Sequence, residues 1–135
     1  MTVIDASLAL AWLFNEERAS EADTLLALAA ADGIAVPPLF WLEVANALRT
    51  RIRRGVINEA FRDGGLARVR ALGAVTATTS DVAEQLLDRT IILSDRHGLT
   101  VYDAAYLELA LRLGAPLRTF DEALARAAVI AGAVA

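Results

Sequence analysis

With 135 residues, 56% of them hydrophobic, the chain is long enough to fold as one domain, residues 1–135, with a substantial buried core. It contains no cysteine, which excludes disulfide bonds, thiol catalysis and cysteine-based zinc sites, and its net charge of −4 argues at first sight against a nucleic-acid partner. Because no apolar run approaches the roughly 20 residues of a membrane span and the N-terminal segment lacks the basic flank of a signal peptide, we expect a soluble, cytoplasmic protein without a membrane partner.

The first part of the chain alternates short apolar strands with longer helices. Residues 2–4 predict a strand, and residues 8–14 predict a helix with Asp5 or Ser7 as its N-cap. A second helix over residues 19–32 ends at Gly33, and residues 34–36 predict a second strand. Two prolines then favour the start of a helix over residues 39–54, whose predicted core stripe is Trp41, Val44, Ala45, Leu48 and Ile52.

The second part continues the alternation. Residues 58–72 predict a helix weakened by two glycines, residues 74–79 a strand, and residues 80–84 a capping box that opens a helix ending at Gly98. Residues 100–101 predict a strand that runs into the helix carrying Asp103, and residues 117–120 predict the last strand. A final helix begins at Asp121, and the apolar residues 129–135 either pair as an edge strand or pack loosely. The alternation predicts a three-layer α/β/α sandwich with a central, mostly parallel sheet.

Asp103 occupies an unusual position on its predicted helix. A helical wheel places it on the apolar stripe with Tyr106 and Leu107, whereas Glu108 and Arg112 fall on the opposite side as an expected exposed ion pair. A carboxylate on a core-facing stripe is costly unless a cation, hydrogen-bond donors or a metal meets it. Alternatively, Asp103 simply caps its helix.

Four acids are predicted at one edge of the sheet. Asp5, Asp103 and Asp121 each follow a predicted strand, and Glu43 lies on the helix after the second strand. Ligands of open parallel sheets collect at the carboxyl ends of the strands. Each acid alone could be a helix cap, but four carboxylates at one edge repel one another, so a cation is needed. Oxygen ligands without histidine or cysteine favour Mg²⁺ or Mn²⁺, and such a cluster supports phosphodiester hydrolysis.

Other phosphate chemistries are less compatible with this composition. Haloacid-dehalogenase-type phosphatases and response-regulator receivers also carry an Asp after the first strand, but their sites require a lysine, and this chain has none. A phosphate-binding loop of the GxxxxGK[ST] kind is absent for the same reason. His97 lies at a predicted helix C-terminus, where the helix dipole favours it.

Fixed positive charge is concentrated in residues 49–54, where Arg49, Arg51 and Arg54 are candidates for contacting an anionic substrate. Arg54 shares a helix face with Glu43, together with Asn46. These arginines could equally be a solvated helix end, because cations are favoured at helix C-termini. The sequence leaves both interpretations open.

The chain resembles the PIN-domain ribonucleases, and among them the VapC-type toxins of bacterial toxin–antitoxin pairs. The matching segments are VIDASLALAWLF, WLEVANALR, LTVYDAAYLELALRLGAPLRTFDEAL and the apolar tail. The resemblance implies that Mg²⁺ or Mn²⁺ is held by Asp5, Glu43, Asp103 and Asp121. It also implies that hydroxyls of Ser7 and Thr119 support the first aspartate and that Asn46 orients Glu43.

The leading hypothesis is a metal-dependent endoribonuclease that cleaves RNA as a toxin. The resemblance further implies a homodimer and a small cognate antitoxin that covers the site. Two alternatives stay open: a nuclease of the same fold that processes RNA or DNA outside such a pair, and a non-catalytic interaction module that keeps the fold.

Overall fold

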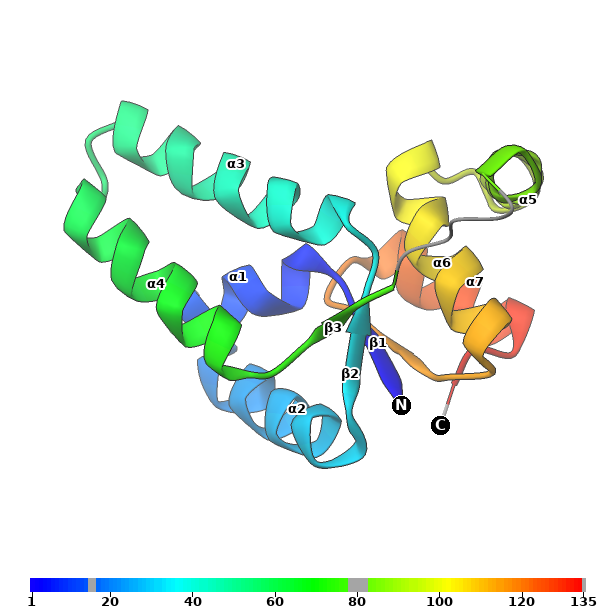
Figure 1. Ribbon diagram of the computed structural model, residues 1–135, viewed down its shortest axis with the longest axis horizontal. Coiled ribbons are helices and arrows are strands. Elements are labelled where there is room, and N and C mark those ends of the chain that lie inside the picture. The colour runs from blue at the N-terminus through cyan, green and yellow to red at the C-terminus, as the bar shows by residue number, and fades with distance from the viewer. Residues whose placement is uncertain (15–16, 78–82, 135) are drawn as a thin grey trace.

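A parallel sheet lies at the centre of the structure, a computed structural model that describes residues 1–14, 17–77 and 83–134 (Figure 1). Its strands, in chain order, are β1 (Thr2–Ile4), β2 (Ile34–Val36), β3 (Val75–Thr76) and β4 (Leu117–Arg118). They pair in the order β3-β2-β1-β4, and each of these pairings is parallel. The carboxyl end of β1 therefore lies between those of β2 and β4.

Helices cover both faces of this sheet, which confirms the predicted α/β/α sandwich. Figure 1 shows α1 to α4 gathered on one side of the sheet and α5 to α7 on the other. None of the described helices combines the length and apolar character that a membrane span requires. Their bounds are α1 (Ala6–Phe14), α2 (Ala19–Asp32), α3 (Leu39–Arg53), α4 (Glu59–Ala71), α5 (Ala83–His97), α6 (Val101–Leu113) and α7 (Glu122–Ala131).

The two inner strands have no polar face, because helices cover them from both sides. Val3, Ile4, Ile34 and Val36 are all completely or almost completely buried. Each such side chain contributes roughly 1.5–3 kcal/mol to folding relative to an exposed one. Thr2 is also buried, and its hydroxyl donates to the Asp32 carboxylate at 2.8 Å. The short apolar runs thus specify the centre of the sandwich.

The predicted strand at residues 100–101 is wrong. Val101 is already the first residue of α6, and Thr100 is its extended N-cap. The Thr100 hydroxyl accepts a hydrogen bond from the backbone N–H of Asp103 at 3.1 Å. Two neighbouring β-branched residues favour a strand in isolation, but threonine before a helix serves equally well as a cap. The helix that carries Asp103 therefore starts without a strand before it.

Other boundaries differ in detail from those predicted. β3 is Val75–Thr76 within the strand predicted at residues 74–79, of which residues 78–79 lie outside the described part of the chain, as do residues 80–82 of the predicted capping box. Residues 129–131 form the last turn of α7 instead of a strand, although the Ala133 carbonyl accepts a bond from the Leu117 N–H at 3.0 Å. In α3, Phe40 is fully buried, whereas Trp41, Ala45 and Ile52 of the predicted stripe are only partly buried.

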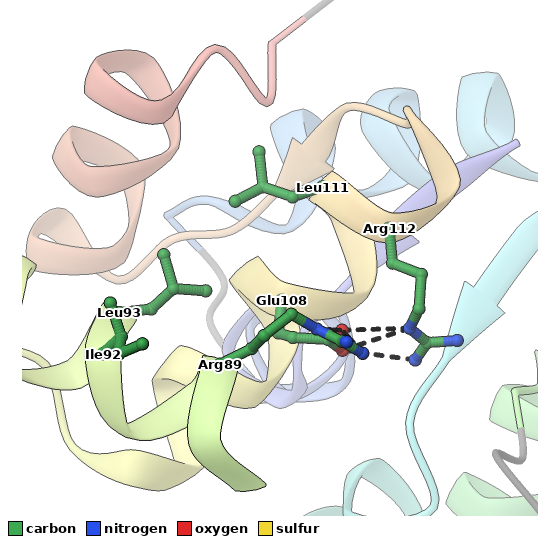
Figure 2. Close-up of a pocket in the computed structure, with 6 residues that line it drawn as sticks. All are labelled: Arg89, Ile92, Leu93, Glu108, Leu111 and Arg112. Carbon is green, nitrogen blue, oxygen red and sulfur yellow. Dashed lines mark hydrogen bonds and ion pairs between the residues drawn. The ribbon is translucent and has the colours of Figure 1, made fainter. Parts of the chain in front are cut away.

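Glu108 is buried, contrary to the expectation of an exposed ion pair. It is 2% exposed, and Arg89 of α5 and Arg112 of α6 each donate to its Oε1 atom at 3.0 Å. Figure 2 shows the two guanidinium groups converging on this carboxylate beside a cavity of about 320 Å³. The wheel of a single helix could not reveal this, because α5 is what covers this face of α6.

We predict that Glu108→Gln lowers the free energy of unfolding by about 1–2 kcal/mol, as measured by urea denaturation. This is less than the roughly 3–5 kcal/mol for breaking a fully buried pair, because Arg89 and Arg112 are 43% and 29% exposed and can rehydrate. Asp63→Asn is the matched control, because Asp63 also pairs with an arginine but is 68% exposed. It should change stability by less than about 0.5 kcal/mol, and equal effects of both substitutions would contradict the assignment.

Candidate active site

The four predicted acids line one cavity of about 300 Å³. Asp5 follows β1, Glu43 lies in the second turn of α3, Asp103 lies in the first turn of α6, and Asp121 directly precedes α7. Because β1 and β4 are parallel neighbours, Asp5 and Asp121 reach the same edge of the sheet. Other residues around this cavity are Ala6, Ser7, Leu10, Asn46, Ala47 and Tyr106.

Asp5 is the most deeply buried of these acids, with 4% exposure. The Ser7 hydroxyl lies 2.7 and 2.9 Å from its two carboxylate oxygens, the Thr119 hydroxyl donates at 2.7 Å, and the Leu8 N–H donates at 3.2 Å. Burial raises the pKa of the Asp5 carboxyl from 3.8 to about 6, although these hydrogen bonds oppose the rise, and the negative charge of Asp103 adds to it. The structure thus contains the hydrogen bonds to Asp5 that the resemblance implied for Ser7 and Thr119.

Asp103 and Asp121 differ in whether they cap a helix. The Asp121 carboxylate accepts a bond from the Leu124 N–H at 2.8 Å and is the N-cap of α7. Asp103 is not the cap of α6, because Thr100 fills that position. Burial, and then the negative charge of Asp121, raises the pKa of Asp103 above its ordinary range. Capping therefore accounts for Asp121 in part but does not account for Asp103.

Tyr106 holds Glu43, and the sequence did not suggest this role. Its hydroxyl donates to Oε1 of Glu43 at 2.6 Å, and its side chain is 1% exposed. Burial, together with the neighbouring Glu43 carboxylate, raises the pKa of Tyr106, so it remains a protonated donor. Asn46 lines the same cavity but is exposed, and no hydrogen bond joins it to Glu43 among the described residues. The available signal was the position of Tyr106 three residues after Asp103, on the same helix face.

The donor set of this cavity fits a hard divalent cation. All four acids offer oxygen ligands, which suit Mg²⁺ or Mn²⁺. The buried Asp5 has hydrogen-bond donors but no basic partner recorded in the described part of the chain. Within that part, no three acidic or histidine side chains are close enough together to hold a metal ion. Binding would require the carboxylates to move inward, as a cation that cancels their repulsion would allow.

Only one of the three predicted substrate-binding arginines adjoins the acids. Arg51 lines a neighbouring cavity that shares Ser7 and Leu10 with the acidic one. Arg49 lines neither cavity, and Arg54 caps the far end of α3 beside Thr50.

Four charged or aromatic residues of the neighbouring cavity were missed by the sequence analysis. They are Phe14 at the end of α1, Glu17 and Arg18 before α2, and Phe120 between two candidate site residues. Phe120 could have been predicted from the sequence, because it lies between the candidate residues Thr119 and Asp121. Nothing in the periodicity of the chain indicated that Phe14 and Arg18 would face it.

The fold and the site together define a class of protein: a parallel α/β/α sandwich with a carboxylate-lined cavity at the carboxyl ends of its strands. Comparison of the sequence with known families identifies the family. The model of the family described as PIN domain matches residues 2–130, and the chain belongs to the PIN-domain family.

Individual relatives cover most of the chain. Ribonuclease VapC3 of Pyrobaculum aerophilum is 37% identical over 123 residues, or 91% of this chain and 91% of that protein. VapC ribonuclease Mb0985 of Mycobacterium bovis and Ribonuclease VapC9 of Mycobacterium tuberculosis are each 36% identical over 121 residues, or 90% of this chain and 86% of theirs. The crystal structure of PAE2754 from Pyrobaculum aerophilum matches with a TM-score of 0.68 over 93% of this chain and 78% of that chain. Its 24% identity supports the fold alone.

The raised pKa of Asp5 predicts a pH dependence of stability in metal-free protein. Between pH 3.8 and about 6, the folded state holds a proton on Asp5 that the unfolded state has released, so the free energy of unfolding falls as the pH rises. Asp5→Asn should flatten this dependence and stabilise the metal-free protein at pH 7 by about 1–2 kcal/mol. Urea denaturation in EDTA between pH 5 and 7 measures both effects. Asp95→Asn, an exposed acid on α5, should keep the wild-type slope, and an unchanged slope in Asp5→Asn would refute the prediction.

Tyr106→Phe tests the positioning of Glu43. Loss of the hydroxyl should weaken the affinity for Mn²⁺ by about 10-fold, in the range seen when partners of metal ligands are removed. Stability should fall by only about 1 kcal/mol, since one hydrogen bond is lost. Isothermal titration with Mn²⁺ and thermal unfolding provide the two readouts. Tyr102→Phe, an exposed tyrosine on the same helix, should change neither, and a wild-type Mn²⁺ affinity in Tyr106→Phe would contradict this role.

Proposed function

We propose that this protein is a metal-dependent endoribonuclease that acts as the toxin of a toxin–antitoxin pair. The observation that carries the proposal is the convergence of Asp5, Glu43, Asp103 and Asp121 on one cavity in a chain of the PIN-domain family. The relatives named as VapC ribonucleases, which align with about nine-tenths of the chain, support both the activity and the biological role.

Asp5, Glu43 and Asp103 would hold Mg²⁺ or Mn²⁺, and Asp121 would contribute as a fourth acid. When bound, the metal supplies a Lewis acid that activates water and offsets charge on the scissile phosphate. Ser7 and Thr119 hold Asp5 through their hydroxyls, and Tyr106 holds Glu43. These hydrogen bonds orient the Asp5 and Glu43 carboxylates, which limits the reorganisation needed during metal binding and cleavage.

Positively charged groups near the acids would attract the RNA backbone. The acids repel the RNA backbone, so both the metal and nearby cations must attract it. Arg51 is best placed of the predicted arginines, because its cavity adjoins the acidic one. Arg49 and Arg54 lie farther away and would act through the general field of the α3 helix end.

We assign the remaining partners on the same basis. A small cognate antitoxin would block the acidic cavity, and the toxin would act as a homodimer on RNA in the cytoplasm. Exposed apolar side chains on α5 and α7, among them Ile91, Ile92, Val129 and Ile130, offer surface for such assembly.

Substitution of the acids tests the activity. Asp5→Asn and Asp103→Asn should each slow RNA cleavage in Mg²⁺ or Mn²⁺ by at least about 100-fold, because even the partners of metal ligands contribute up to that much. Both variants should stay folded, lose growth inhibition and lose the rise in melting temperature that Mn²⁺ gives the wild type. Asp95→Asn should behave as wild type in each assay.

Two outcomes would overturn the proposal. If Asp103→Asn cleaved RNA at the wild-type rate, the site assignment would be wrong. If the protein cleaved RNA but no small protein encoded next to its gene inhibited it, the nuclease would work outside a toxin–antitoxin pair.

A further inference from the structure

A second cavity, of about 760 Å³, opens directly beside the acidic one. The two share Ser7 and Leu10 in their walls, so they adjoin one another. The second cavity contains two arginines and two phenylalanines close to a site proposed to cut RNA. The charged and aromatic residues around it are Phe14, Glu17, Arg18, Arg51 and Phe120.

The arginines and phenylalanines form two stacked pairs. The Arg18 guanidinium lies 3.5 Å from the centroid of the Phe120 ring, and that of Arg51 lies 4.1 Å from the Phe14 centroid. Arg18 also donates to Glu21, and Arg51 to the Ala47 carbonyl at 3.3 Å. Stacking holds a planar guanidinium in place while its N–H groups point along its edges, where they can meet a phosphate.

Phe120 is fixed relative to the acids. Its backbone N–H donates to the Ser7 hydroxyl at 3.0 Å, and the same hydroxyl bonds the Asp5 carboxylate. Its chain neighbours are Thr119, which bonds Asp5, and Asp121, which lines the acidic cavity. The aromatic ring therefore stands at a set position next to the carboxylates.

We propose that this cavity binds the nucleotide adjacent to the scissile phosphate of a single-stranded RNA, a proposal that rests on the function proposed above. The base stacks against the Phe120–Arg18 pair, and Arg51 contacts the next phosphate. Aromatic rings and guanidinium planes are the surfaces on which unpaired RNA bases stack. A base inside a duplex could not reach them, so the substrate must be unpaired at this position. The Glu17 carboxylate supplies an acceptor for a base amino group.

The test combines variants with abasic RNA. A short RNA with one cleavage site is prepared with an abasic residue at each position flanking that site in turn, and steady-state kinetics are measured in Mn²⁺. Phe120→Leu should raise KM about fivefold or more and leave kcat within about twofold, in line with the loss of one stacked base. One abasic position should raise KM of the wild type similarly, and should raise that of Phe120→Leu no further.

Arg68→Gln is the matched control. Arg68 stacks on Trp12 at 4.4 Å, and neither residue lines the acidic cavity or the second cavity. This variant should keep the wild-type KM. Arg18→Gln repeats the test without removing a ring that packs against the core, so the inference stays testable if Phe120→Leu fails to fold. It should also raise KM and lose sensitivity to the same abasic position.

The outcomes separate the two proposals. A wild-type protein that cleaves no RNA would sink the function itself. If the wild type cleaved RNA but no abasic position raised its KM, the subsite alone would be overturned. The same holds if the abasic residue and Phe120→Leu raised KM independently, so that their effects multiplied. If the variants changed only inhibition by a protein partner, the cavity would belong to that partner and the RNA assignment would be wrong.

Discussion

The buried carboxylate of Asp5 is the constraint on which the site depends. An acid with so little exposure is costly to ionise, and three hydrogen-bond donors from two segments offset this cost: Ser7 and the Leu8 N–H at the start of α1, and Thr119 after β4. The same hydroxyls also bind the backbone of Phe120 and Asp121. Supporting one carboxylate thus ties the carboxyl ends of two neighbouring strands together. The site and the sheet edge stabilise each other.

This arrangement leaves part of the electrostatic cost unmet. Burial raises the pKa of Asp5 by more than its hydrogen bonds lower it, so the net shift is upward. The pKa of Asp103 is raised as well, by burial and by the negative charge of Asp121. Proteins commonly keep such destabilised groups at functional sites. A divalent cation, as the proposed function requires, would relieve both acids at once.

Much of this could be predicted from local sequence. Short apolar runs specified the parallel sheet, and acids after those runs indicated the edge where the cavity lies. Most of the predictions that failed depended on contacts between elements. Glu108 was expected at the surface because the wheel of α6 contains no information about α5, and Tyr106 was assigned to the core because its hydroxyl partner lies 63 residues away. The strand at residues 100–101 failed for a local reason, since Thr100 had two plausible roles and the cap prevailed. The pairing of arginines with phenylalanines beside the acids could not be predicted from the sequence, because only the fold brings Arg18 to Phe120.

The bond between Thr119 and Asp5 spans 114 positions of the chain, and this separation has a consequence for biosynthesis. Contacts between distant residues form late, and a nascent chain folds as it leaves the ribosome. Asp5 emerges well before its hydroxyl partner Thr119, which follows β4, and before the neighbouring Asp121. A ribosome-bound fragment therefore holds an incomplete site. Synthesis itself delays the appearance of a competent cavity until both segments have been made.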